Sequence, residues 1–155
     1  MVYDKSDDSF VVSLRHQGAV IKIDRTSGDL IWILGTPGGW RAPWKERLLT
    51  PRDDVQWPYH QHNCEIAADG NLFLFDNGNF RARPFEPKLP ATENFSRVVE
   101  FAIERQNRSV SQVWSFGGPG PDALYSPIIS SAARLPETPT SGDGERPGEF
   151  WWPDR

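Results

Sequence analysis

The chain has 155 residues, of which 37% are hydrophobic and 12% aromatic, enough to build the core of one globular domain. Its 17 lysines and arginines stand against 21 aspartates and glutamates, for a net charge of -4. No basic block could follow a phosphate backbone, so we expect no nucleic-acid partner. The single cysteine, Cys64, excludes an internal disulfide framework, and no apolar run approaches the ~20 residues of a spanning helix, so we expect no membrane insertion.

Alternating Val, Ile, Phe and Trp residues predict short strands joined by tight turns. In the first unit, about residues 5–35, the pattern predicts strands at 9–15, 19–24 and 30–35, with a Thr-Ser-Gly-Asp turn before the third. Helix signals are nearly absent.

A second unit, about residues 62–117, repeats this order. Asp-Gly-Asn introduces a predicted strand at 72–76, which is followed by strands at 97–104 and 110–117 with a polar turn between them.

The third strand of each unit ends in a Trp that lies three residues before a Gly. These are Trp32 with Gly35 and Trp114 with Gly117, and the two tryptophans are 82 residues apart. Since one propeller blade takes about 40–45 residues, this separation fits about two blades with long connecting loops.

We therefore predict an all-β fold of antiparallel β-propeller blades, as an incomplete fragment of two to three blades within residues 1–135. A propeller needs at least four blades to close. The Pro- and Gly-rich stretch 136–155 contains two adjacent tryptophans, and we expect a loop or a truncated next blade there; a disordered tail is the alternative. The competing fold is a small antiparallel sandwich of the same strands.

Two of the three histidines, His60 and His62, lie in the segment Tyr59–Asn63 at the expected entry of a strand. On an extended backbone, residues two apart face the same side. The pair could bind a metal with a third ligand, or could fill structural roles at a turn. The candidates for a third ligand are His16, Asp76 and Glu65.

Arg15 lies at the end of the first predicted strand, where its planar guanidinium could bind a sulfate, phosphate or carboxylate. A surface ion pair is the alternative. The motif Asp76-Asn77-Gly78 favours a turn with positive φ, although its aspartate could also orient an imidazole.

Several stretches together carry a family resemblance. They are Ser13–His16, Ile21–Asp24, Gly28–Gly35, His60–His62, Phe75–Gly78, Phe95–Phe101, Gln112–Gly117 and Tyr125–Ile128. In this order the chain resembles the bacterial aryl-sulfate sulfotransferases, the PAPS-independent arylsulfotransferase family, over roughly residues 9–130.

The resemblance implies a six-bladed propeller that transfers a sulfuryl group from an aryl sulfate donor to a phenolic acceptor through a transiently sulfated histidine, without a cofactor or a metal. His62 matches the nucleophilic histidine, and Arg15 matches the arginine that grips the sulfate oxygens. His60 is then a neighbour of the nucleophile. As walls of an aromatic substrate pocket we expect Trp57, Tyr59 and Trp40.

Two departures accompany the resemblance. The family uses a histidine in a His-x-Asn motif and a further histidine upstream, and neither is matched here. A family threonine after the Tyr-Ser-Pro-Ile stretch corresponds to Ile129, with Ser130 beside it as the remaining hydroxyl for substrate binding. We therefore expect a fragment that is inactive alone.

The resemblance also implies a periplasmic or otherwise extracytoplasmic location, with a homodimer as a candidate assembly. Two alternatives stay open. One is a non-catalytic propeller module that binds a ligand or a partner. The other is a quinoprotein-like dehydrogenase propeller, which should show acidic and amide ligands for calcium.

Overall fold

The computed structural model describes residues 1–82, 86–121 and 123–133. This part of the chain forms strands and three short 3-10 helices and has no α-helix, which confirms the all-β prediction. The elements in chain order are β1 (Val2–Asp4), β2 (Ser9–Leu14), η1 (Arg15–Gln17), β3 (Ala19–Asp24), β4 (Leu30–Gly35), η2 (Trp44–Arg47), β5 (Thr50–Pro51), β6 (His62–Ile66), β7 (Leu72–Asp76), η3 (Ala91–Glu93), β8 (Arg97–Glu104) and β9 (Ser109–Gly117).

The predicted strands at 19–24, 30–35, 72–76 and 97–104 are confirmed with the predicted bounds, and the other two differ by one residue. The sequence pattern missed β1 and β5. Both are edge strands of two or three residues, too short to show a period of their own, and their pairing depends on the neighbouring strand.

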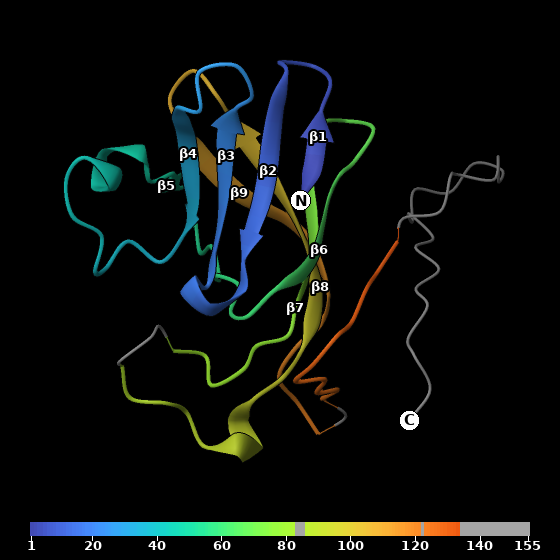
Figure 1. Ribbon diagram of the computed structural model, residues 1–155. Coiled ribbons are helices and arrows are strands. Elements are labelled where there is room, and N and C mark those ends of the chain that lie inside the picture. The colour runs from blue at the N-terminus through green and yellow to red at the C-terminus, as the bar shows by residue number, and fades with distance from the viewer. Residues whose placement is uncertain (83–85, 122, 134–155) are drawn as a thin grey trace, which may run out of the picture.

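The strands predicted within each unit lie in the same sheet, and β1 and β5, which lie outside the predicted bounds of the units, are added at the sheet edges (Figure 1). The first sheet has the order β1-β2-β3-β4 with antiparallel neighbours, and the second has the order β5-β9-β8-β7-β6, in which only β5 runs parallel to its neighbour β9. Trp32 lies on β4 and Trp114 on β9, so their separation of 82 positions takes the chain from the first sheet to the second. The propeller and its number of blades stay predictions, because the described residues form two open sheets and a propeller is a closed ring of at least four.

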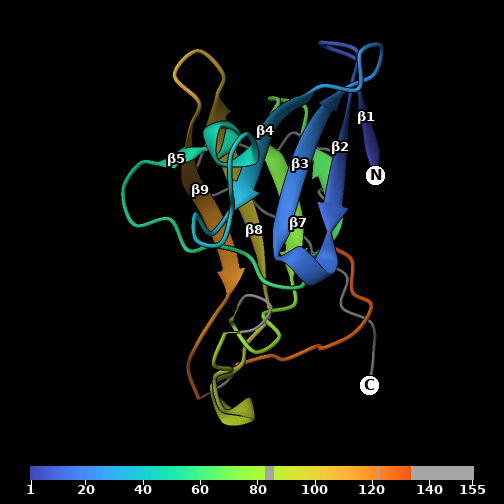
Figure 2. The same cartoon turned by 60° about the vertical axis from the view of Figure 1, so that its left-hand side comes forward.

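The two sheets pack against each other through one apolar cluster (Figures 1 and 2). Its buried members come from both sheets and include Val11, Trp32, Leu74 and Phe101. Alternate residues of β7 point the other way, where Phe73 and Phe75 pack with Val98 and Ala132 in a smaller cluster. The second sheet is therefore apolar on both faces, as expected for a sheet between two layers.

The strand registers define two ends of the molecule. At one end, which is lower in Figure 1, lie the η1 turn, the start of β6 at His62, the end of β7 and the start of β8. At the opposite end lie the turns between β1 and β2 and between β8 and β9.

A cluster of charges around the buried Lys22 lies at that opposite end. Lys22 is only 2% exposed, and its Nζ lies 2.5 Å from Asp4 and 2.8 Å from Asp7. Arg105 pairs with the same two carboxylates at 3.3 and 2.8 Å. Burial opposes ionisation of Asp4, but hydrogen bonds from Lys22 and Ser6 prevail and lower its pKa from 3.8 to about 2.

The predicted domain limit at residue 135 and the loop or next blade at 136–155 lie outside the described residues.

Candidate active site

His62 is the first residue of β6, and its imidazole contacts a buried amide. The Nδ1 atom lies 2.6 Å from Oδ1 of Asn77, and Asn77 is completely buried. The other end of the amide, Nδ2, donates a hydrogen bond of 2.7 Å to the carbonyl oxygen of Ser126. Since that carbonyl can only accept, Oδ1 must face His62, and Nδ1 of His62 must carry the proton. In the neutral imidazole this arrangement leaves the lone pair on Nε2.

Asn77 is itself fixed by its neighbours. The hydroxyl of Ser96 donates to the Asn77 carbonyl at 2.8 Å and accepts from the Ser126 backbone at the same distance. Gly78, the next residue, has a φ of 68°, and a Cβ there would stand 1.9 Å from the carbonyl oxygen of Phe95. Only glycine fits this position.

A buried ion pair holds the segment that precedes His62. The Asp76 carboxylate accepts from Arg97 Nε at 2.9 Å and from the Tyr59 backbone at 2.8 Å. Arg97 is 2% exposed and donates to the carbonyl of Gln56 at 2.7 Å. Residues 56 to 59 are thereby bound to the end of β7 and the start of β8. These buried contacts fix the course of the backbone that leads to His62.

Arg81 adds a second cation to the same carboxylate. Its Nη2 lies 3.2 Å from Asp76, and its guanidinium carbon stacks 3.4 Å above the ring of Phe95. Burial lowers the pKa of Arg81, which Asp76 partly offsets.

Arg15 begins the η1 turn after β2 and is partly exposed. Its Nη2 donates to the carbonyl of Pro127 at 3.2 Å, and the same oxygen accepts from Asn79 at 2.8 Å. Pro127 follows Ser126, whose carbonyl holds Asn77. The two predicted catalytic residues are thus linked through two consecutive backbone carbonyls, although they come from different sheets.

Gln61 joins those two sheets directly. It is completely buried, and its Nε2 donates to the carbonyl of Ala19 at 2.7 Å and to the hydroxyl of Ser13 at 3.1 Å. The Ser13 hydroxyl in turn donates to the Gln61 carbonyl. Arg15 lies two residues after Ser13, and His62 follows Gln61. This bridge therefore fixes the backbone next to both predicted catalytic residues.

The expectation that His60 and His62 share one face of an extended strand is wrong. His60 has a φ of 54° and precedes β6, so its backbone turns at this point. Its ring packs edge-on against His16 at 5.9 Å and Phe80 at 5.8 Å. Burial, and then the nearby charges of Arg15 and His16, lower the pKa of His60 below its usual value.

Of the other predicted ligands of a metal ion, His16 packs against the His60 ring, while Asp76 and Glu65 are engaged by other side chains. Asp76 is engaged by arginines, and Glu65 accepts a hydrogen bond from Asn63. Among the described residues no group of three or more His, Cys, Asp or Glu side chains is placed to hold a metal ion.

The predicted substrate residues differ in their surroundings. Trp57 packs against the main apolar cluster, and the Tyr59 ring lies beside Gly18. Trp40 donates from its indole to the carbonyl of Thr36. Ser130 is 6% exposed, and its hydroxyl lies 2.6 Å from that of Ser126, the residue that accepts from Asn77. Their roles toward a substrate stay predictions.

The residue that sequence reasoning missed is Asn77. The motif Asp76-Asn77-Gly78 was interpreted as a turn, with its aspartate as the group that could orient an imidazole. The asparagine contacts His62 instead, while Asp76 serves the arginines. The motif itself could have indicated this contact, since the residue that follows a strand can face a histidine that lies beside the end of that strand.

This arrangement defines the class of the site. The Nε2 of His62 has no hydrogen-bond partner among the described residues, and Arg15 is linked to His62 through the carbonyls of Ser126 and Pro127. A histidine of this kind can attack an electrophile, and an arginine beside it can bind an anionic group of that electrophile.

The comparisons with known proteins agree with that class. The profile of the family described as arylsulfotransferase (ASST) matches residues 1–141. The arylsulfate sulfotransferase AssT of Escherichia coli O6:H1 is 37% identical and that of Lelliottia amnigena is 33% identical, each over 84% of this chain. The chain belongs to the arylsulfotransferase family. It spans 24% of the length of each of these relatives.

Proposed function

We propose that this chain carries the nucleophile and one sulfate-binding residue of an aryl-sulfate sulfotransferase. In this proposal His62 accepts a sulfuryl group from an aryl sulfate and passes it to a phenol, and Arg15 binds the sulfate oxygens. The observation that carries the proposal is the 2.6 Å contact between His62 Nδ1 and Asn77 Oδ1.

That contact supports the role of His62 because it selects one tautomer. A neutral imidazole is nucleophilic only at the nitrogen that lacks a proton. With Nδ1–H donated to Asn77, the lone pair is on Nε2 in the resting protein. No external base is then needed to generate the nucleophile.

The proposed sulfuryl transfer takes place in two steps. In the first, the Nε2 lone pair forms an N–S bond while the bond between sulfur and the aryl oxygen breaks, and the departing phenolate takes a proton from solvent. In the second, the oxygen of the acceptor phenol loses its proton to solvent and attacks sulfur, and the N–S electron pair returns to Nε2. The products are a phenol and a new aryl sulfate.

Arg15 supports the same chemistry through charge. The sulfuryl oxygens stay negative while the aryl oxygen departs, so fixed cationic donors contribute more than further covalent groups. Arg15 uses one Nη2 bond to Pro127, which sets its orientation, and its remaining Nη donors are left for an anion. Trp57, Tyr59 and Ser130 complete the proposal as contacts of the aromatic substrate.

Partners and location follow from the family. The names of both relatives indicate arylsulfate sulfotransferase activity. For this chain an aryl sulfate donor, a phenolic acceptor, an extracytoplasmic location and a homodimer belong to the proposal. No helix in the described residues is long and apolar enough to cross a membrane. Cell fractionation and sedimentation test the location and the assembly.

The test uses the longest natural protein that contains this sequence, beside the 155-residue chain. It is mixed with 4-nitrophenyl sulfate and phenol, and phenol-dependent release of 4-nitrophenolate is followed. Removing a covalent nucleophile should lower turnover at least about a thousandfold, which we expect for His62→Asn. Arg15→Lys should lose most activity because a point cation cannot replace the bidentate fork.

His60→Asn is the matched control, since it removes a neighbouring imidazole. With donor alone, mass spectrometry should find one sulfuryl group on the peptide that contains His62 in the wild type and in His60→Asn. Undiminished turnover of His62→Asn would refute the assignment. A folded natural protein that forms no adduct would favour the non-catalytic binding module.

A further inference from the structure

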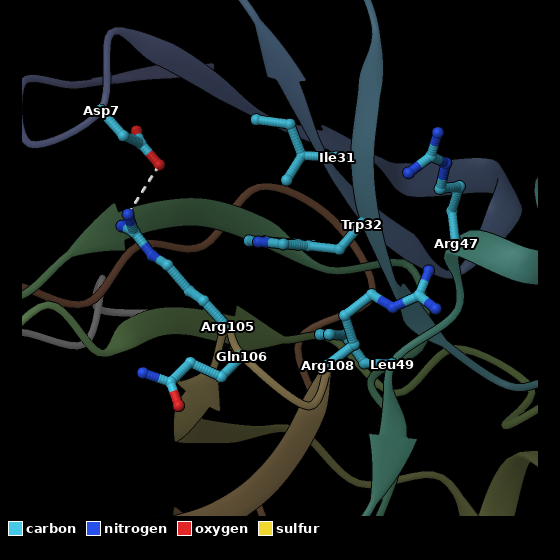
Figure 3. A pocket seen from close by; sticks show the side chains of 8 residues that line it. All are labelled: Asp7, Ile31, Trp32, Arg47, Leu49, Arg105, Gln106 and Arg108. Atoms are coloured by element: carbon cyan, nitrogen blue, oxygen red, sulfur yellow. Dashed lines mark ion pairs between the residues drawn. The ribbon is translucent and has the colours of Figure 1, made fainter.

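A pocket lies at the end of the molecule opposite His62. It has a volume of about 330 Å³ and opens between the two sheets, within the size range of small-molecule sites (Figure 3). The first sheet contributes Ile31 and Trp32 of β4, and the turn between β8 and β9 contributes Arg105 and Arg108. Arg47, from the end of η2, completes the wall beside them.

The charges of this pocket do not cancel. Asp7 lines it but is shared, because it and Asp4 together neutralise Lys22 and Arg105. Two carboxylates thus balance two cations.

Two guanidinium groups remain without a carboxylate partner within the described residues. Among the described residues Arg108 donates only to the backbone carbonyl of Glu46, at 2.6 Å, which does not compensate its charge. The Arg47 guanidinium forms no hydrogen bond or ion pair with any described residue, since only the Arg47 backbone takes part in η2. A concave surface with two free guanidinium groups attracts an oxyanion, and the planar forks suit carboxylate, sulfate and phosphate.

The floor of the pocket is apolar. Trp32 and Leu49 are 5% and 3% exposed, and Ile31 is partly buried beside them. Figure 3 shows the indole of Trp32 between the Asp7–Arg105 pair on one side and Arg47 with Arg108 on the other. The indole Nε1 has no hydrogen-bond partner among the described residues, so it is available as a further donor.

We propose that this pocket binds a single-ring organic anion, with the ring against Trp32 and Leu49 and its oxyanion between Arg47 and Arg108. The site is separate from His62, since the two occupy opposite ends of the strands. A purely inorganic anion would use the arginines but leave the floor unfilled, and a neutral ring would use only the floor.

The test follows Trp32 itself. The 155-residue chain is labelled with 5-fluorotryptophan, and its 19F resonance is assigned by Trp32→Phe. Benzoate is the probe, because it carries a ring and a carboxylate and cannot donate a sulfuryl group. Benzoate should shift the Trp32 resonance saturably, and added salt should weaken the binding.

Arg47→Gln and Arg108→Gln should each weaken benzoate binding about tenfold, because each removes a charge-assisted contact. Arg41→Gln, an exposed arginine outside the pocket, is the matched control and should leave the affinity unchanged. Far-UV circular dichroism verifies that each variant keeps the β-sheet spectrum. Benzamide, which has the ring but no charge, and inorganic phosphate should bind at least tenfold more weakly than benzoate.

Arg15→Gln distinguishes this pocket from the histidine site. The Trp32 titration should be unchanged in that variant. The proposal is overturned if benzoate does not shift the Trp32 resonance, if either pocket variant binds as the wild type does, or if Arg15→Gln abolishes the shift. Equal binding of phosphate would overturn the role of the apolar floor.

Discussion

The contact between Asn77 and His62 gives the sharpest prediction. Asn77→Ala removes the Oδ1 atom that lies 2.6 Å from His62 Nδ1 and also the Nδ2 donor to Ser126. In the resting protein this is a hydrogen bond between neutral groups. When Nε2 forms a bond to sulfur, the ring becomes cationic and the same bond becomes charge-assisted.

The expected effect follows from that difference. A neutral hydrogen bond contributes roughly 0.5–1.5 kcal/mol and a charged one roughly 1.5–3 kcal/mol, so the contact strengthens by about 1–1.5 kcal/mol along the reaction. We therefore expect Asn77→Ala to lower kcat/KM for the aryl sulfate donor about tenfold. Loss of tautomer selection should add to this reduction.

Two assays separate positioning from general stability. The 15N shifts of the His62 imidazole in the 155-residue chain report which nitrogen carries the proton, and sulfuryl transfer is measured in the longest natural protein. Asn79→Ala is the matched control, because Asn79 is equally part of the segment and donates to Pro127 at 2.8 Å without touching the imidazole. We expect the Nδ1–H form to dominate in wild type and in Asn79→Ala, and a mixture of tautomers in Asn77→Ala. An unchanged 15N pattern and an unchanged rate in Asn77→Ala would refute the reasoning.

Three further predictions concern the scaffold. Asp76→Asn leaves the buried Arg97 without its carboxylate and should destabilise the fold by about 3 kcal/mol or more in urea unfolding; a loss below about 1 kcal/mol would show that the pair does not hold the segment before His62. Gly78→Ala should destabilise far more than Gly28→Ala, since both have positive φ but only at Gly78 would a Cβ stand 1.9 Å from a carbonyl oxygen; equal melting temperatures of the two variants would contradict this. Because the pKa of Asp4 falls from 3.8 in the unfolded chain to about 2 on folding, its contribution of ~2 kcal/mol is complete above about pH 4 and is lost as the pH falls toward 2. Asp4→Asn should flatten that part of the stability profile, and an unchanged profile would exclude the contribution.

The sequence by itself determined the strands. Their apolar residues alternate with period two and are bounded by Asp-Gly and Ser-Gly turns, so β3, β4, β7 and β8 could be predicted with their bounds. The sequence also identified Arg15 and His62 as candidates, because residue types and the order of motifs can be compared with a family without coordinates. These features are local, and local patterns can be recognised in the sequence alone.

Only the tertiary structure decided what each side chain meets. The bend at His60, the contact of Asn77 with His62 and the bridge from Gln61 to the first sheet all join residues through turns or across sheets. Such contacts depend on how the two sheets pack. They also depend on where a strand ends, and a shift of that end by about one residue would change them. A period-two pattern gives the facing of a strand but not the partner beyond its end, so the sequence predicts a turn at Asp76-Asn77-Gly78 and does not predict the contact of Asn77 with the imidazole.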